Sequence, residues 1–269
     1  MKVRAALASA TARLQAVSDT PRLDAELLIA HVLGASREEM LLNRLDGRAP
    51  AWEPLVLRRL AHEPVAYIIG RRVFWTIELE VGPGALIPRP DSETLIEAAI
   101  AHFGDKGPRR ILDLGTGPGT LLLAALDQWP EATGIGVDAS EAALGYARRN
   151  AVARAEFRIG NWDEGLDERF DLILANPPYV EAGAALPPEI ARWEPAGALY
   201  AGLDGLAAYR ALAPGIGRLL APGGIACVEI GAGQEMAASA LFAAQGFTSE
   251  SRSDLRGIMR CLVLRPDRD

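Results

Sequence analysis

Cysteine and histidine are both scarce in this chain of 269 residues, which contains two cysteines and three histidines. Cys227 and Cys261 each lie inside an apolar run, where a reduced core thiol is the expected state rather than a disulfide or a metal ligand. His31, His62 and His102 are too dispersed to match the spacing of a metal site. We therefore expect no bound metal and no disulfide framework.

Long apolar runs are also missing. The run from Thr120 to Leu126 ends at Asp127, well short of the roughly 18 apolar residues that span a bilayer. The first residues, with Arg4 and Arg13 among alanines, contain no apolar segment of a secretory signal. We expect a cytoplasmic protein with no membrane association.

Lysine occurs only at positions 2 and 106, and the formal net charge of -7 is unevenly distributed. Residues 1–75 carry 11 Lys and Arg against 8 Asp and Glu, a balance of +3. Residues 76–269 carry 17 against 27, a balance of -10. Because duplex nucleic acid is a polyanion, we expect no direct binding of it by the larger, acidic part.

The first 63 residues predict a small helical bundle. Thr20 before Pro21 marks the start of a helix and Gly34 marks its end, while Ser36 and Glu39 match a capping box. The following segment VFWTIELEV and the Gly-Pro-Gly after it indicate a strand and a turn. We expect a β-hairpin there that links two domains.

From Arg110 onward, short apolar strands alternate with helical stretches, which is typical of a parallel sheet built from βαβ units. The predicted strands are RILDLG, GIGVD, AEFRIG, DLILAN and IACVEI. Two last strands, near residues 247–251 and 258–264, are separated by little more than SDLRG. That connection is too short for a helical crossover, so the two should form an antiparallel hairpin at the sheet edge.

A glycine-rich turn follows the first of these strands in ILDLGTGPG, residues 111–119, where the backbone can approach a ligand at a helix N-terminus. A dinucleotide fingerprint needs a glycine where Thr120 stands, and Asp113 would repel a pyrophosphate but suit the ammonium group of a methionine. Asp138 ends the next strand, where a carboxylate can accept both ribose hydroxyls. Together these features favour S-adenosylmethionine over a purely structural turn.

Asn161 and Trp162 follow the third predicted strand. They are placed to hydrogen-bond and to pack against an adenine ring. The alternative is that Trp162 only caps the core.

Asn176, Pro177, Pro178 and Tyr179 follow the strand DLILA directly. A planar NH2 group is a poor nucleophile because its lone pair is delocalised. The Asn176 side-chain oxygen and the Pro177 carbonyl can each accept one N–H of such a group and hold it toward a methyl sulfonium. Pro178 keeps Pro177 extended, and Tyr179 offers a face for stacking. This loop is therefore the predicted substrate and catalytic site, with a rigid structural loop as the alternative.

These motifs resemble the bacterial release factor glutamine methyltransferases. DLGTGPG and NPPY are flanked by IPRPDSETLIE upstream and by RWEPAGALYAGLDGLAAYR and PGGIACVEIGAGQ downstream. The resemblance extends from PRLDAELLIAHVLG to SDLRGIMRCLVL and so covers almost the whole chain. NPPY also occurs in DNA adenine methyltransferases, so the flanking segments make the match specific.

The resemblance implies a substrate, the glutamine of a Gly-Gly-Gln tripeptide in peptide chain release factors. Its side-chain nitrogen would be methylated in a direct in-line transfer without a metal, giving S-adenosylhomocysteine. Three positions depart from the family pattern: Pro118, Asn161 and Ala201 stand where a small residue, an aspartate and a glycine are usual. The cofactor contacts expected from the motifs and the resemblance are Asp113, Gly115, Thr116, Gly117, Pro118, Gly119, Asp138, Asn161, Trp162 and Asn176.

The expected fold class is α/β: a doubly wound, Rossmann-like, seven-stranded methyltransferase sheet with an antiparallel last strand, plus a small N-terminal helical bundle. The expected domains are a helical substrate-docking domain (1–70), a β-hairpin linker (71–90) and an S-adenosylmethionine-dependent methyltransferase domain (91–269). The chain is expected to be a monomer.

Docking is assigned to the helical domain because a pocket for one glutamine cannot distinguish release factors from other proteins with an exposed glutamine. The arginines expected to contribute are Arg13, Arg22, Arg37, Arg44, Arg48, Arg58 and Arg59. Solvated helix faces are the alternative for these side chains. The alternatives for function are a ribosomal-protein glutamine methyltransferase, a nucleic-acid adenine methyltransferase and a cofactor-binding protein without activity.

Overall fold

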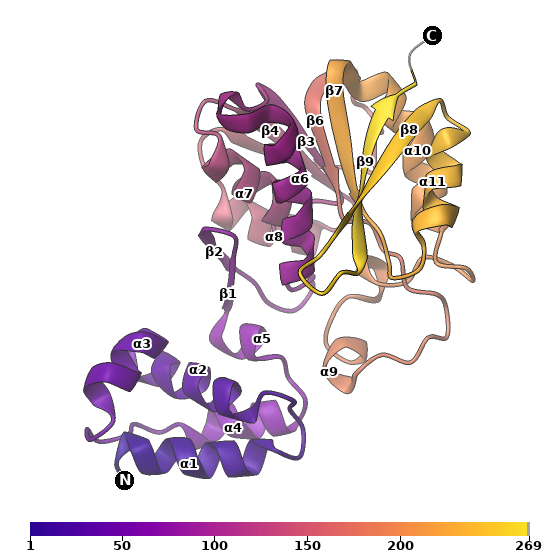
Figure 1. Ribbon diagram of the computed structural model, residues 1–269. Coiled ribbons are helices and arrows are strands. Elements are labelled where there is room, and N and C mark those ends of the chain that lie inside the picture. The colour runs from indigo at the N-terminus through magenta and orange to yellow at the C-terminus, as the bar shows by residue number, and fades with distance from the viewer. Residues whose placement is uncertain (268–269) are drawn as a thin grey trace. The chain divides into compact units, whose positions relative to one another are not determined.

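The computed structural model describes residues 1–267, and its backbone contacts divide the chain into two compact units. Unit 1 consists of residues 1–71 together with Leu186–Trp193, and unit 2 contains residues 72–185 and the chain from Glu194 onward. Figure 1 follows the chain by colour from its N-terminus to its C-terminus. Within the described residues, no helix is both long enough and apolar enough to cross a bilayer.

Unit 1 is a bundle of short helices, which confirms the predicted N-terminal helical region. The helices are α1 (Val3–Leu14), α2 (Pro21–Leu33), α3 (Arg37–Glu39) with a π-helical turn after it (Met40–Arg44), α4 (Glu53–Leu60), α5 (Val65–Ile69) and α9 (Pro188–Ala191). Their apolar faces form one core, in which Leu7, Leu28 and Val56 are buried. The burial of this apolar surface is the main force that holds such short helices together.

The helix ends in unit 1 match the sequence signals in part. Gly34 adopts a left-handed conformation at the end of α2, and the Ser36 side chain accepts a hydrogen bond from the Glu39 N–H at 3.0 Å. Thr20 does not cap α2, because its hydroxyl donates to Asp24 instead, at 3.3 Å. The preorganised φ of Pro21 starts this helix without a side-chain cap.

The division into units differs from the expected segments because α9 belongs to unit 1. Glu189 of α9 accepts a hydrogen bond from Arg59 at 3.1 Å, and Arg59 also pairs with Asp24 at 2.8 Å. Arg59 is only 5% exposed, so the prediction that it contributes to a docking surface is wrong. A buried guanidinium needs carboxylate partners, and Glu189 is one of the two that it finds here.

The hairpin expected near residues 71–90 lies earlier than its predicted turn. Strands β1 (Arg71–Phe74) and β2 (Ile77–Glu80) pair with each other, and Trp75 and Thr76 form the turn between them. Trp75 has a positive φ of 54°, and its N–H donates to Glu93 at 3.0 Å. VFWTIELEV therefore contains the hairpin turn within it, because a side-chain acceptor stabilises the unusual conformation of Trp75.

Unit 2 is built on a sheet with strand order β5-β4-β3-β6-β7-β9-β8, and its strands up to β7 run parallel. β9 is antiparallel to both of its neighbours, which confirms the predicted Rossmann-like sheet with an antiparallel last strand. The strands are β3 (Arg110–Leu114), β4 (Thr133–Asp138), β5 (Ala155–Ile159), β6 (Phe170–Ala175), β7 (Leu220–Glu229), β8 (Phe247–Ser253) and β9 (Met259–Pro266).

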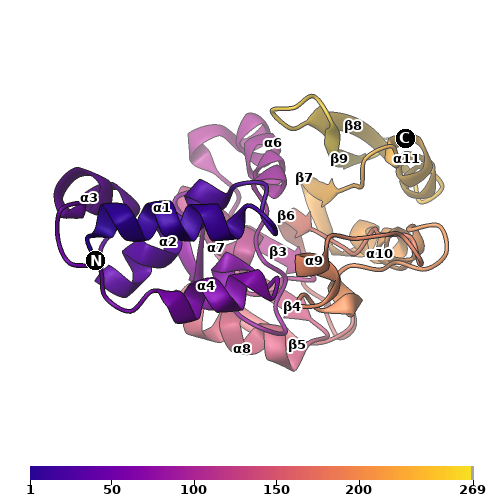
Figure 2. The ribbon, with the colours of Figure 1, turned by 90° about the horizontal axis from the view of Figure 1, so that it is seen from below.

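Helices cover both faces of this sheet. One layer contains α6 (Glu93–Phe103), α7 (Thr120–Gln128) and α8 (Glu141–Asn150), and the other contains α10 (Ala207–Leu219) and α11 (Glu235–Ala243). Figures 1 and 2 show α7 and α10 on opposite sides of the strands. The core under α10 and α11 includes Ile173, Tyr209 and Phe242. Burial on both faces explains why the central strands are mostly apolar in sequence, whereas the edge strand β5 includes Glu156 and Arg158.

Candidate active site

A cavity of about 440 Å³ lies in unit 2, a size typical of small-molecule sites. Its lining includes the ends of β3 and β4 and the segments that follow β5 and β6. β3 has β4 on one side and β6 on the other, so the strand order reverses at this point. Ligands in open α/β sheets bind at the carboxyl ends of the strands at such a switch point.

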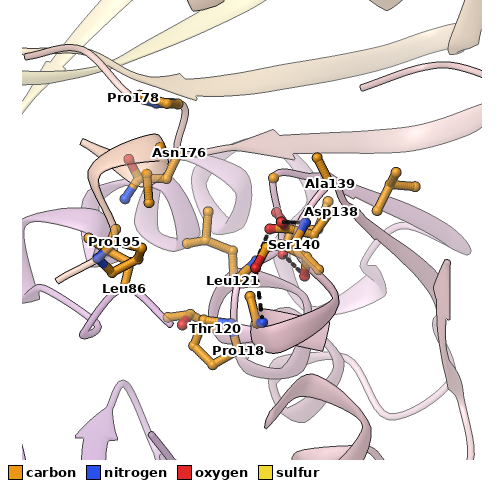
Figure 3. Close-up of a pocket in the computed structure, with 18 of the residues that line it drawn as sticks. Leu86, Pro118, Thr120, Leu121, Asp138, Ala139, Ser140, Asn176, Pro178 and Pro195 are labelled. Atoms are coloured by element: carbon orange, nitrogen blue, oxygen red, sulfur yellow. Dashed lines mark hydrogen bonds between the residues drawn. The ribbon is translucent and has the colours of Figure 1, made fainter. Parts of the chain in front are cut away.

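Ten of the residues predicted from sequence line this cavity, and Figure 3 shows several of them. Asn176 and Pro178 lie on one side, and Asp138 and Ser140 lie on the other. Gly119, Pro177 and Tyr179 are the three predicted site residues outside its lining. The ten lining residues are Asp113, Gly115, Thr116, Gly117, Pro118, Asp138, Asn161, Trp162, Asn176 and Pro178.

The glycine-rich turn joins β3 to α7 and adopts backbone conformations that favour glycine. Gly115 has a φ of 74°, and a Cβ on it would lie 3.3 Å from the Trp162 ring. Gly119 has a φ of 89°, and a Cβ there would lie 2.9 Å from Leu123. Gly115 thus leaves room at the cavity wall, while Gly119 lets α7 start close to its own next turn.

Asp113 presents one satisfied and one unsatisfied carboxylate oxygen. Oδ2 accepts hydrogen bonds from Thr116 at 2.6 Å and from the Leu122 N–H at 3.1 Å. Oδ1 is buried and has no partner among the described residues. Burial raises the pKa of Asp113 to about 7, because desolvation disfavours the charged form. An acceptor of this kind at a cavity wall fits a cationic group of a ligand.

Asp138, at the end of the neighbouring strand β4, binds the backbone of the glycine-rich turn. Its Oδ2 accepts the Gly117 N–H and its Oδ1 accepts the Ser140 N–H, both at 2.8 Å. Burial raises the pKa of Asp138 as well, and the backbone hydrogen bonds oppose that shift. A carboxylate has about four lone-pair sites, so each oxygen retains capacity for one further donor such as a ribose hydroxyl.

Trp162 both lines the cavity and packs against the core of unit 2. Its φ of 54° lies in the left-handed region, which non-glycine residues seldom adopt. Asn161 is exposed beside it. The two interpretations of Trp162 are therefore compatible, because one part of the ring supports the core while another part faces the cavity.

The NPPY loop is tied to two side chains that the sequence analysis left without a role. The Asn176 Nδ2 donates to Ser92 Oγ at 3.0 Å, and the Tyr179 hydroxyl donates to Glu229 Oε1 at 3.3 Å. Burial, and then the neighbouring Glu229, raises the pKa of Tyr179. Pro177 of this loop is buried. Tyr179 is thus a neutral donor at neutral pH, and its hydroxyl is fixed toward the protein interior.

A wall beside Asn176 was also missed by sequence reasoning. Glu194 accepts the Ile87 N–H at 3.1 Å and pairs with Arg89. This contact joins the segment before α6 to the segment after α9, and Leu86 and Pro195 line the same cavity as Asn176 (Figure 3). One sequence signal was available for Glu229, since a carboxylate ends the apolar strand IACVEI. Glu194 lies in the flanking segment RWEPAGALY that carries the resemblance, although no local pattern marks its role.

Comparisons with known proteins agree with this geometry. A family model described as "PrmC N-terminal domain" matches residues 5–70, and one described as "Methyltransferase domain" matches residues 105–256. A release factor glutamine methyltransferase from Rhodospirillum rubrum is 45% identical, covering 92% of this chain and 79% of its own. One from Cereibacter sphaeroides is 41% identical, covering 98% of this chain and 99% of its own.

A solved methyltransferase structure from Pyrococcus furiosus supports the fold alone. It has a TM-score of 0.53 and 18% identity, and the match covers 78% of this chain and 96% of the other. The relatives named above confirm the resemblance that the motifs predicted. On their identity and coverage, this chain belongs to the release factor glutamine methyltransferase family.

Proposed function

We propose that this protein transfers a methyl group from S-adenosylmethionine to the side-chain nitrogen of the glutamine in the Gly-Gly-Gln motif of peptide chain release factors. One observation carries the proposal: a single cavity is lined by Asp113, which has one carboxylate oxygen without a described partner, by Asp138 and by Asn176. Family membership and the names of the relatives support the same substrate. Release factors act in the cytoplasm, so the proposal places the enzyme there.

The residues around the glycine-rich turn fit the cofactor. Asp113 Oδ1 would accept from the ammonium group of the methionine moiety, and Asp138 would accept from the ribose hydroxyls. Trp162 would pack on the adenine, with Asn161 beside it. When bound, S-adenosylmethionine supplies an electrophilic methyl group on its sulfonium. The glycine-rich turn keeps side chains away from that part of the cavity.

The NPPY loop provides the groups that would bind a side-chain amide as the methyl acceptor. Asn176 Oδ1 and the Pro177 carbonyl would each accept one N–H of the glutamine, which orients the nitrogen and increases its electron density. Tyr179 would stack on the planar amide, and Pro178 keeps the loop extended. The methylated nitrogen can lose its proton to water, so no general base is assigned.

We further propose that unit 1 docks the release factor. Most of the arginines predicted for this role are held in ion pairs inside unit 1, namely Arg22 and Arg37 with Glu26, Arg44 with Glu39, and Arg58 with Glu63. Arg48 is exposed and has no described carboxylate partner. The proposal therefore concentrates on Arg48 and on the positive balance of the unit as a whole.

A labelling experiment tests the proposed reaction. The protein is incubated with cofactor labelled in the methyl group and, separately, with a release factor, a ribosomal protein and DNA. We expect label only in the release factor, and none when the glutamine of its Gly-Gly-Gln motif is replaced by alanine. Label in the ribosomal protein or in DNA instead would contradict the proposal and support the corresponding alternative substrate.

A further inference from the structure

A chain of hydrogen bonds runs from the cavity to a buried carboxylate in unit 2. Asn176 Nδ2 donates to Ser92 Oγ at 3.0 Å, and Ser92 Oγ donates to Glu229 Oε2 at 2.5 Å. Tyr179 donates to the other oxygen of Glu229 at 3.3 Å. Ser92 and Glu229 are 2% and 1% exposed. The chain therefore links both ends of the NPPY loop to one buried group.

The ionised carboxylate sets the direction of every hydrogen bond in this chain. Glu229 as a carboxylate has no proton to donate, so Ser92 and Tyr179 must both donate to it. Because the Ser92 hydroxyl proton is donated to Glu229, Ser92 Oγ can only accept a hydrogen bond from Asn176. Only the NH2 end of the Asn176 amide can satisfy that acceptor, which leaves Oδ1 as the end available to a substrate N–H.

Ser92 is the last residue of a 3-10 helical turn, Pro90–Ser92, that leads directly into α6. It therefore lies inside a helical segment, where a serine side chain is not expected to cap the first turn. Here its backbone is helical, with φ of -70° and ψ of -15°, and its side chain makes no capping bond. Its hydroxyl is thus free of any capping role, and it bonds to Glu229 and Asn176.

We infer that Ser92 and Glu229 are positioning residues that hold the Asn176 amide with its oxygen toward the glutamine nitrogen. The opposite orientation would place two NH2 groups face to face, and transfer would fail. This inference rests on the proposed function, because it takes the glutamine amide to bind at Asn176.

Protonation of Glu229 would relax this control. Burial raises the pKa of Glu229 to about 7. A protonated Glu229 can donate to Ser92, and Ser92 can then donate to Asn176 Oδ1 after a flip of the amide. The productive form is therefore present above that pKa and is lost as the pH falls through it. The other titratable or charged groups that influence Glu229, or that it influences, are Asp91, Tyr179, Tyr209, Arg260 and Cys261.

Three variants of the full-length chain test the positioning role. Ser92→Ala removes the acceptor, Ser92→Thr keeps a hydroxyl, and Thr94→Ala is a matched control on the first turn of α6, also buried. With release factor as substrate, we expect Ser92→Ala to lower kcat by about 10- to 100-fold, as misorientation of a reacting group does. Cofactor affinity should stay unchanged, Ser92→Thr should restore most of kcat, and Thr94→Ala should keep the wild-type kcat.

The pH profile gives a readout that a purely structural role would not change. At saturating cofactor, kcat of the wild type should fall as the pH is lowered through about 7. Glu229→Gln should remove this dependence, because the amide cannot ionise. An acidic limb that persists unchanged in Glu229→Gln would overturn the role of Glu229.

Hydrogen exchange of the Asn176 side-chain NH2, followed by NMR without substrate, separates this inference from the proposed function. Exchange should be slow in the wild type and in Thr94→Ala, and fast in Ser92→Ala. Equal exchange in all three proteins, or a wild-type kcat in Ser92→Ala, would overturn the inference. Wild-type protein that shows the expected exchange but labels no release factor would contradict the proposed function alone.

Discussion

At the scale of single residues, the two carboxylates of the cavity differ in how many of their oxygens already accept hydrogen bonds from the protein. Asp138 uses both oxygens on backbone N–H groups of the loops beside it. Asp113 keeps one buried oxygen without a described partner. Asp138 therefore shapes the glycine-rich turn in the free protein, whereas Asp113 carries an electrostatic penalty that a cationic ligand would relieve.

Replacement of Asn176 by alanine tests the role of the acceptor itself. We expect Asn176→Ala to reduce methyl transfer by on the order of 10²-fold or more, because an oriented hydrogen-bond partner of the reacting group is lost. Cofactor affinity, measured by titration calorimetry, should change little, because the cofactor is assigned mainly to other residues. Near-normal turnover of this variant would remove the proposed mechanism.

The raised pKa of Asp113 predicts a pH dependence of stability in the absence of cofactor. The folded protein holds the Asp113 proton up to about pH 7, whereas an unfolded chain releases it near pH 4. This contribution to the free energy of unfolding is full below about pH 4 and is lost as the pH rises through 7. The Asp113→Asn variant has no proton to release at this position, so its free energy of unfolding does not contain this pH-dependent contribution.

Urea unfolding of both proteins at pH 5 and pH 8 measures the effect. Relative to the wild type, Asp113→Asn should gain stability between the two pH values, on the order of 1 to 3 kcal/mol. The same difference between the two proteins at both pH values would show that the Asp113 carboxyl is not destabilised by burial.

At the scale of secondary-structure elements, two glycines of β4 determine how closely α7 and the glycine-rich turn before it approach the sheet. A Cβ on Gly134 would lie 2.3 Å from Leu122 Cδ1, and one on Gly136 would lie 2.7 Å from Thr116 Oγ1. The two glycines in GIGVD therefore leave one face of β4 without side chains at their positions, which lets α7 pack closely against the strand. That close approach also brings the glycine-rich turn to the end of β4, where Asp138 binds it.

Gly134→Ala should lower the free energy of unfolding by about 1 to 3 kcal/mol, because the added methyl group overpacks the interface between β4 and α7. Gly145→Ala is the matched control, since it lies within α8 and a Cβ there meets only Arg149 Nη1, at 3.8 Å. This control should gain up to about 1 kcal/mol from helix propensity. Equal effects of the two substitutions in urea unfolding would contradict the proposed close packing.

The sequence predicts the elements of unit 2 better than their side-chain connections. Apolar segments and βαβ spacing locate β3 to β6 and the second half of β7, and burial on both faces gives the central strands a local signature. Local patterns did not predict the hairpin turn at Trp75, because that turn depends on the distant residue Glu93. They also did not predict that Glu189 belongs to unit 1, because that depends on its ion pair with Arg59. The roles of Ser92 and Glu229 were also out of reach, because partners 137 residues apart leave no trace in spacing.

At the scale of the whole molecule, the uneven charge is a property of each unit that survives the internal ion pairs. Unit 1 carries 11 Lys and Arg against 9 Asp and Glu, a balance of +2 that pairing within the unit does not change. Long-range steering depends on that balance, whereas specific contacts depend on free side chains such as Arg48. Screening by salt distinguishes the two contributions.

Charge reversal at Arg48 tests the docking role. Arg48→Glu should slow methylation of an intact release factor by several-fold at low salt and leave the rate on a short Gly-Gly-Gln peptide unchanged. Arg256→Glu makes the same change in charge at an exposed position of unit 2, and it should not change the ratio of the two rates. An unchanged ratio in Arg48→Glu would exclude Arg48 from docking.

The ion pair between Arg59 and Glu189 also constrains the order in which the chain can be completed. These residues are 130 positions apart, so at about 5 to 20 residues per second Glu189 is synthesised roughly 6 to 26 seconds after Arg59. During that interval, Asp24 is the one carboxylate partner already made for the Arg59 side chain. Residues 1–71 of unit 1 are thus synthesised before the sheet of unit 2, and the unit acquires α9 only after β3 to β6 have been made.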